Sequence, residues 1–89
     1  MEEVVITFDA TIDAIHGEKL LAEAGLKPLV MPLPSQVKAG CGLCLRVRLE
    51  DGTRACELLC SHGVSQAGCF IRRLGQGGST YEEWWEGSL

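Results

Sequence analysis

The sequence predicts an α+β domain with the ferredoxin-like order β-α-β-β-α-β, folded as a two-layer sandwich and followed by a short acidic tail. Three observations support this prediction. Apolar runs of strand length alternate with two segments of helical periodicity, prolines bracket the second run, and the composition changes abruptly after residue 74. With 89 residues, the chain has the size of one small domain. We therefore expect a single domain over residues 1–74.

The first strand and the first helix are predicted at the start of the chain. Residues 4–8 form a β-branched, nearly continuous apolar run that is typical of a strand inside a sheet. Asp9 or Thr11 can then cap a helix that ends at Gly25, since glycine accepts the left-handed terminal conformation. Small residues recur along this helix at steps of four and three, so that one face can lie close to a sheet. They are Ala10, Ala14, Gly17, Leu21 and Ala24, with Ile15 and Ala22 widening the stripe.

Two strands are predicted around the middle of the chain, with a loop over residues 35–42 between them. Residues 29–31 form a short strand bracketed by prolines, which lack the donor that an interior strand needs, so we place it at a sheet edge. Residues 43–49 alternate between apolar and polar side chains, which is typical of a strand with one buried face. Cys44 and Arg46 fall on the polar face of this strand.

The remaining elements are less uniform in pattern. Residues 53–62 are compatible with a helix or with a hairpin that starts at Asp51 and Gly52, and the helix is favoured because the apolar residues break strict alternation. Residues 67–74 supply a fourth strand. After it, residues 75–89 are read as a glycine-rich joint and an acidic tail that is either disordered or docked through Trp84 and Trp85.

Charge and composition exclude several classes of function. Eight basic and twelve acidic side chains give a net charge of −4, which disfavours general binding to nucleic acid. The first twenty residues carry acids where a signal peptide needs a basic start, and no apolar run approaches the roughly 20 residues of a membrane span. We therefore expect a cytoplasmic protein that binds neither nucleic acid nor membrane. In that reducing compartment, five cysteines do not indicate a disulfide framework.

Cys41 is the strongest candidate for a reactive residue. It lies between two glycines at the end of a predicted loop, which leaves its backbone adaptable and its sulfur accessible. Lys38, Arg46 and Arg48 are near it in the sequence, and no acid lies between residues 35 and 49. Cations favour the nucleophilic thiolate, so Lys38 and Arg46 are predicted to stabilise it. The alternative is a cysteine that only tolerates a turn.

The other cysteines allow more than one interpretation. Cys41 and Cys44 form a C-x-x-C pair, so Cys44 is a candidate resolving thiol, although this pair leads into a strand whereas thioredoxin-type pairs open a helix. Cys56 and Cys60 share a helical face and could complete a four-cysteine zinc or iron–sulfur site with that pair. Their spacing is not that of a zinc ribbon. Small buried hydrophobes are the favoured interpretation of Cys56, Cys60 and Cys69, and no cofactor is expected.

Five short motifs of this sequence occur together in a known family. They are Asp-Ala-Ile at residues 13–15, Glu-Lys-Leu-Leu at residues 18–21, Ala-Gly at residues 24–25, Pro-Leu-Pro at residues 32–34 and Cys-Gly-Leu-x-Leu-Arg at residues 41–46. Through these motifs, residues 4–74 resemble the putative selenium/sulfur carrier protein-like family. Members of this family are small bacterial domains that are found alone or fused to a domain similar to the sulfurtransferase TusA. The resemblance implies that Cys41 carries sulfur or selenium as a persulfide or selenide.

The resemblance also has limits and implications for partners. Where this chain has Cys44, the family usually has a small residue other than cysteine, and Cys56, Cys60, Cys69 and the tryptophan-bearing tail lie outside the pattern. A carrier implies a cysteine desulfurase or another sulfur or selenium donor, and an acceptor protein. No general base or phosphate-binding loop is evident, so we expect a carrier rather than a stand-alone enzyme. The alternatives are a cysteine-ligated metal-binding module and a non-catalytic interaction or dimerisation domain, and a homodimer stays open.

Overall fold

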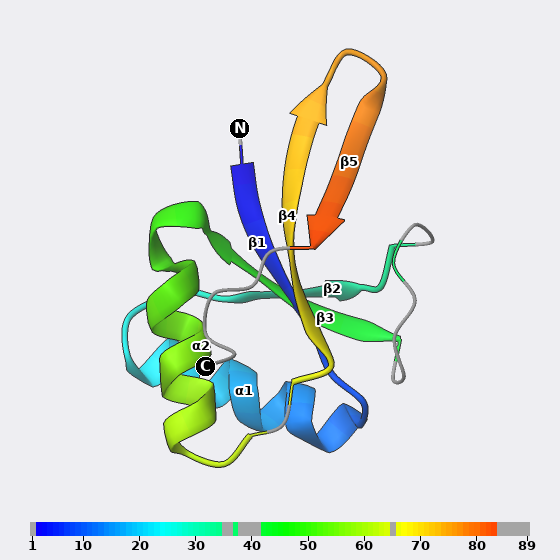
Figure 1. Cartoon of the computed structure of the whole chain (residues 1–89). Coiled ribbons are helices and arrows are strands. Elements are labelled where there is room, and N and C mark those ends of the chain that lie inside the picture. Colours follow the sequence, from blue (N-terminus) through cyan, green and yellow to red (C-terminus); the bar gives the residue numbers. More distant parts are fainter. Residues whose placement is uncertain (1, 35–36, 38–41, 65, 84–89) are drawn as a thin grey trace.

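The structure is a computed structural model that describes residues 2–34, 37, 42–64 and 66–83. In chain order, the elements are β1 (Glu2–Thr7), α1 (Thr11–Glu23), β2 (Leu29–Pro32), β3 (Leu43–Arg48), a 3-10 turn η1 (Leu49–Asp51), α2 (Gly52–Ser61), β4 (Gly68–Gly75) and β5 (Gly78–Glu83). The described residues thus form a mixed α/β domain of five strands and two α-helices (Figure 1). Residues 53–62, whose pattern is compatible with a helix or a hairpin, lie mostly in the helix α2, so the favoured helix is confirmed.

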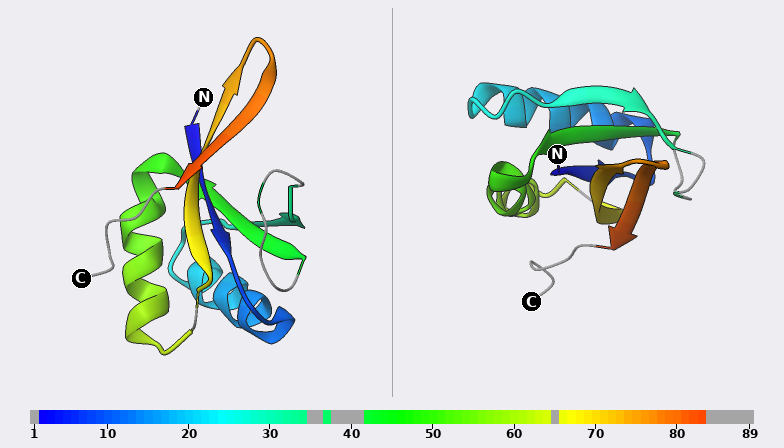
Figure 2. Two further views of the ribbon diagram at one scale, coloured as in Figure 1. Left: turned by 45° about the vertical axis from the view of Figure 1, so that its right-hand side comes forward. Right: turned by 90° about the horizontal axis from the view of Figure 1, so that it is seen from above.

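The strands form one sheet in the order β2-β3-β1-β4-β5, and every neighbouring pair is antiparallel. β2 lies at one edge, as its prolines predict. The sequence pattern does not predict the fifth strand, because residues 78–83 fall within the predicted joint and tail. It pairs with β4 along its whole length, and the resulting hairpin projects away from the two helices (Figures 1 and 2). The sheet is therefore larger than the four-stranded sheet of the predicted arrangement.

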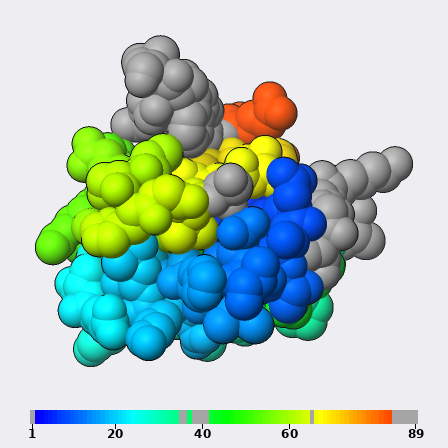
Figure 3. Space-filling model, turned by 90° about the horizontal axis from the view of Figure 1, so that it is seen from below, coloured from blue at the N-terminus to red at the C-terminus, as the bar shows by residue number. Residues whose placement is uncertain are grey.

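Both helices pack on the same face of the sheet, which we call the helix face. Strand alternation places Val4, Ile6, Leu45, Val47 and Cys69 on it, and these side chains form one buried cluster with apolar residues of the helices. The helix residues of the cluster are Ala14 and Leu21 from α1 and Ala55, Cys56 and Leu59 from α2. Seen from below, α1 and α2 lie side by side (Figure 3). Each large apolar side chain buried here contributes roughly 1.5–3 kcal/mol to stability.

The small residues of α1 allow the close approach that the sequence predicts. Ala14, Gly17 and Leu21 are buried. A Cβ atom at Gly17 would lie 3.2 Å from both Leu59 Cδ2 and Phe8 Cζ, which is closer than ordinary van der Waals contact. Two parts of the prediction are wrong. Ile15 and Ala22 are exposed, so the buried stripe is narrower than expected.

The ends of α1 differ in how well they were predicted. The N-cap residue is Ala10, with no side-chain cap hydrogen bond, so neither Asp9 nor Thr11 caps the helix. Thr11 is already helical, and Asp9 precedes the cap position. The predicted stop at Gly25 is confirmed: its φ is +83°, and the N–H of Leu26 donates to the carbonyl of Leu21 at 3.0 Å.

The opposite face of the sheet, which we call the second face, is not simply polar. Val5, Thr7 and Cys44 alternate with the helix-face residues and are nevertheless fully buried. Nearer the β4–β5 hairpin, this face carries Glu3 and Arg72. None of the helices in the described ranges combines the length and the apolar character that crossing a membrane requires.

Candidate functional site

The connection between β2 and β3 contains the predicted carrier residue. The N–H of Leu33 donates to the carbonyl of Gly42 at 2.9 Å, which continues the β2–β3 ladder by one pair beyond Pro32 and Leu43. Gly42 has a φ of +80°, a conformation that glycine adopts without strain. Cys41 and Lys38 lie outside the described residues, so their predicted roles stay predictions.

Val37, in the same connection, is described and buried. Its N–H donates to the carbonyl of Pro34 at 3.0 Å, which is a turn contact. The β2–β3 connection is therefore attached to the domain at described positions on both sides of the predicted carrier residue. The Leu33–Gly42 hydrogen bond joins its two ends, and Val37 within it is buried.

Cys44 is buried rather than placed on a polar face, which corrects the prediction. It lies opposite Thr7 on one side and Met31 on the other, and none of its surface is exposed. Its Sγ lies 3.7 Å from the carbonyl oxygen of Met31 and 3.8 Å from that of Pro32, so the thiol donates weak hydrogen bonds to β2. Alternation predicted which face Cys44 is on but not that this face is buried there. Its role as a resolving thiol stays a prediction.

Arg46 forms an ion pair within the sheet. Its Nε lies 3.1 Å from Glu3 Oε2, and the Arg46 side chain is 30% exposed. Arg48 lies 3.5 Å from Asp51, which follows it in η1. The positive charge that the sequence places near Cys41 is therefore partly neutralised by acids from β1 and η1, which the local sequence window did not include.

Glu3 also binds a second arginine. Arg72 NH1 donates to Glu3 Oε1 at 2.6 Å, and Arg72 Nε donates to the Tyr81 hydroxyl at 3.3 Å. The hydrogen bond with Tyr81, and then the one with Glu3, raise the pKa of the Arg72 guanidinium above its ordinary value. The Glu3 carboxylate of β1 thus binds arginines of β3 and β4, and Arg72 extends this network to Tyr81 of β5 on the second face. Nothing in the sequence pattern indicated this network.

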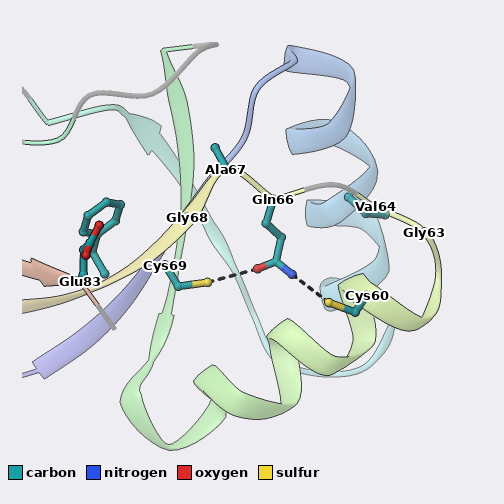
Figure 4. Close-up of a pocket in the computed structure, with 9 residues that line it drawn as sticks. Cys60, Gly63, Val64, Gln66, Ala67, Gly68, Cys69 and Glu83 are labelled. Atoms are coloured by element: carbon teal, nitrogen blue, oxygen red, sulfur yellow. Dashed lines mark hydrogen bonds between the residues drawn. The ribbon is translucent and has the colours of Figure 1, made fainter. Parts of the chain in front are cut away.

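Three cysteines and a glutamine meet where α2 faces β4. The sulfur atoms of Cys56 and Cys69 are 3.1 Å apart, and both residues are buried, as predicted. Cys69 donates to Gln66 Oε1 at 3.1 Å, and Gln66 Nε2 donates to Cys60 Sγ at 3.4 Å (Figure 4). Cys60 is exposed, so the expectation that it is a buried hydrophobe is wrong.

This cluster borders an open groove of about 650 Å³. Its lining includes Cys60, Val64, Gln66, Cys69, Phe70 and Glu83. Cys60 and Cys69 lie on either side of the Gln66 amide in Figure 4. The hydrogen bond with Cys56, together with burial and the nearby thiols, raises the pKa of the Cys69 thiol well above its ordinary value. These surroundings therefore favour the protonated form of the Cys69 thiol.

The alternative of a four-cysteine metal site is not supported by the positions of its described members. Cys44 lies on the second face, whereas Cys56 belongs to the cluster on the helix face. The sheet therefore separates them, and Cys41, the remaining member of the first pair, lies outside the described residues. Over the part of the chain that the structure describes, no three His, Cys, Asp or Glu side chains are grouped so as to hold a metal ion.

Comparison with known proteins gives a family match. The family model described as "Putative Se/S carrier protein-like" matches residues 3–71. The chain belongs to this family.

A curated relative covers a smaller part of the chain. The Uncharacterized protein YtiA of Escherichia coli (strain K12) is 33% identical to the Se/S carrier-like chain over 52 residues, 58% of this chain. The aligned part spans 61% of the length of that relative. No solved structure matches the chain.

The family match relates the Se/S carrier-like domain to the elements of the fold. It runs from β1 into β4 and includes the β2–β3 connection with the predicted carrier position. It ends at residue 71, before Tyr81 and the rest of β5. The groove beside Cys60 therefore combines residues inside the family match with Glu83 outside it.

Proposed function

We propose that this domain is a sulfur or selenium carrier in which the Cys41 thiolate accepts a sulfur or selenium atom from a donor protein and delivers it to an acceptor. The family match over residues 3–71 carries this proposal, since it spans Cys41 and the family is described as carrier-like. The donor is a cysteine desulfurase or another protein that bears a cysteine persulfide or its selenium counterpart, in which the terminal atom is selenium bonded to the cysteine sulfur. We place the carrier in the cytoplasm, and we propose that its first four strands and two helices are a ferredoxin-like unit that β5 extends.

The proposed transfer needs only one nucleophile on this chain. The Cys41 thiolate attacks the terminal sulfur of the donor persulfide, the new S–S bond forms on Cys41, and the donor cysteine leaves as a thiolate. The transferred sulfur keeps its oxidation state, so no external oxidant or reductant is consumed. In delivery, the acceptor thiolate attacks the terminal sulfur of the Cys41 persulfide, the S–S bond to Cys41 breaks, and Cys41 leaves as a thiolate.

The described surroundings support this proposal in part. The hydrogen bond between Leu33 and Gly42 ties together the two ends of the connection that bears Cys41. Such an anchored connection can present a thiol to a partner without rearrangement of the sheet. Arg46 contributes less to stabilisation of the thiolate than a guanidinium without a counter-charge would, because the Glu3 carboxylate lies 3.1 Å from its Nε.

Loading by a desulfurase tests the proposal. The reduced protein is incubated with a cysteine desulfurase and L-cysteine, and its intact mass is measured before and after treatment with a reductant. We expect a gain of one sulfur that the reductant removes and that Cys41→Ser lacks. Cys60→Ser is the matched control, since Cys60 is an exposed thiol of α2 and its loss should leave the gain unchanged. An equal gain in Cys41→Ser would exclude Cys41 as the carrier.

A further inference from the structure

Two thiols that the carrier chemistry does not use are close enough to react with one another. The Sγ atoms of Cys56 and Cys69 lie 3.1 Å apart, one on α2 and the other on β4. The sulfur atoms in a disulfide are about 2.05 Å apart, so each side chain needs to move by only about half an ångström. The two residues are separated by 13 positions in the sequence, and the sheet and helix packing holds their side chains together.

The pair is buried but borders a groove through which a small reagent can approach. Cys69 is 4% exposed and lines the groove, whereas Cys56 is 3% exposed and is not among the lining residues. The Gln66 side chain lies between Cys69 and the exposed Cys60 (Figure 4). The Gln66 amide hydrogen-bonds to both of these thiols, so it has to turn aside before a reagent reaches Cys69. Of the two buried thiols, Cys69 therefore meets a reagent first, and Cys56 lies behind it.

We propose that Cys56 and Cys69 form a modification site at which a low-molecular-weight disulfide oxidises the two thiols to an intramolecular disulfide. This site is separate from the carrier position in the β2–β3 connection. The resulting disulfide joins the middle of α2 to the start of β4. It makes a covalent loop of the residues from Cys56 to Cys69, several of which line the groove.

The reaction proceeds by two exchanges. Cys69 loses its proton and attacks one sulfur of the reagent, which forms a mixed disulfide and releases the first reagent thiolate. Cys56 then loses its proton and attacks the Cys69 sulfur, which forms the Cys56–Cys69 bond and releases the second thiolate. The two protons convert both thiolates to thiols. Overall, two protein thiols are oxidised by two electrons and one reagent disulfide is reduced to two thiols.

Cys60 is the chemically matched alternative within the same cluster. It follows Cys56 by one helical turn, but its sulfur contacts the Gln66 amide at 3.4 Å. As an exposed thiol, it should form a mixed disulfide with the reagent faster than Cys69, whose raised pKa keeps its thiolate fraction small. Modification of Cys60 therefore reports that the reagent is active, and conversion of the buried pair should be slower.

Peptide mapping of the full chain tests the proposal. The reduced protein is treated with glutathione disulfide until Cys60 is fully modified and for hours beyond, and remaining thiols are then alkylated under denaturing conditions. Trypsin produces a peptide of residues 55–72 that contains all three cysteines, and cleavage after Glu57 separates Cys56 from the other two. Cys41 and Cys44 fall in a different tryptic peptide, residues 39–46, and do not interfere.

We expect peptide 55–57 to be disulfide-linked to peptide 58–72, with fragmentation placing the bond on Cys69. The linked species should persist in Cys60→Ser, because Cys60 is exposed and takes no part in the bond. It should be lost in Cys69→Ser. A bond from Cys56 to Cys60 would instead persist in Cys69→Ser and would overturn the proposal. Full alkylation of Cys56 and Cys69 after complete modification of Cys60 would overturn it as well. The measurement on the unsubstituted protein decides between these outcomes even if a variant does not fold.

Discussion

Glu3 binds two arginines from different strands, and its surroundings decide how much these ion pairs contribute to stability. Its side chain is 15% exposed, and the side chains of Arg46 and Arg72 are 30% and 19% exposed. Glu2, one residue earlier on the same strand, pairs with Arg73 at 2.6 Å, but both of those side chains are about 40% exposed. Because solvent screens exposed pairs, we expect the Glu3 interactions to be worth more than the Glu2 interaction.

Replacing the Glu3 carboxylate by an amide should therefore destabilise the domain. Glu3→Gln keeps the size of the side chain but leaves two partly buried guanidinium groups without their counter-charge, so we expect a loss of about 2 kcal/mol in the free energy of unfolding. Glu2→Gln is the matched control and should lose less than about 1 kcal/mol. Urea denaturation of both variants measures the difference. Equal losses would show that burial of Glu3 does not matter.

At the scale of elements, the packing of α1 against the sheet depends on the absence of a side chain at Gly17. A Cβ atom there would lie 3.2 Å from Leu59 Cδ2 and 3.3 Å from Leu45 Cδ1. These neighbours belong to α2 and β3, so one position on α1 controls contacts with two other elements. Ala22 lies on the same helix but is exposed, so a larger side chain at this position extends into solvent.

A larger residue at position 17 should separate α1 from its neighbours. Gly17→Val places a branched side chain against three core residues, and we expect a loss of about 1–3 kcal/mol in the free energy of unfolding from overpacking. Ala22→Val introduces the same residue type on the solvent side and should cost less than about 1 kcal/mol through helix propensity alone. Thermal and urea unfolding measure both variants, and a similar loss in the two would contradict close packing at Gly17.

The elements that sequence reasoning found are those with a strong local signal. The apolar run of β1, the prolines beside β2 and the helical spacing in α2 each depend on neighbouring residues only. The burial of Cys44 was missed because it depends on what covers the second face, which alternation within one strand does not reveal. The strand β5 was missed because its residues have little apolar character, and its place in the sheet comes from pairing with β4.

The candidate site shows the same division. Cys41 is indicated by its neighbours in the sequence, and the family match spans it. The approach of Cys56 to Cys69 and the pairing of Arg46 with Glu3 join residues from separate elements. Such contacts depend on tertiary packing, so no spacing rule within a single segment could predict them.

At the scale of the whole molecule, the β4–β5 hairpin extends the sheet beyond the part that the family match covers. The match ends at residue 71, and β5 begins at Gly78. β5 pairs with β4 from Phe70 to Gly75, and Tyr81 accepts a hydrogen bond from Arg72. Without β5, the outer edge of an eight-residue strand would lack its pairing partner.

Removal of this hairpin strand should change the association state of the protein. A chain that ends at Gly75 exposes the β4 edge, so we expect its molar mass by light scattering to rise with concentration more than that of the full chain. A chain that ends at Glu83 retains β5 and is the matched control for loss of the last residues. If the shorter chain has the same molar mass as the control at every concentration, β5 does not protect the β4 edge.

The two outer edges of the sheet also differ in what they offer to another strand. β2 has four residues, is preceded by Pro28 and ends at Pro32, and proline has no N–H to donate. β5 has six residues and no proline. Between these two outer strands of the described sheet, β5 alone can therefore offer a backbone N–H at every position to an added strand.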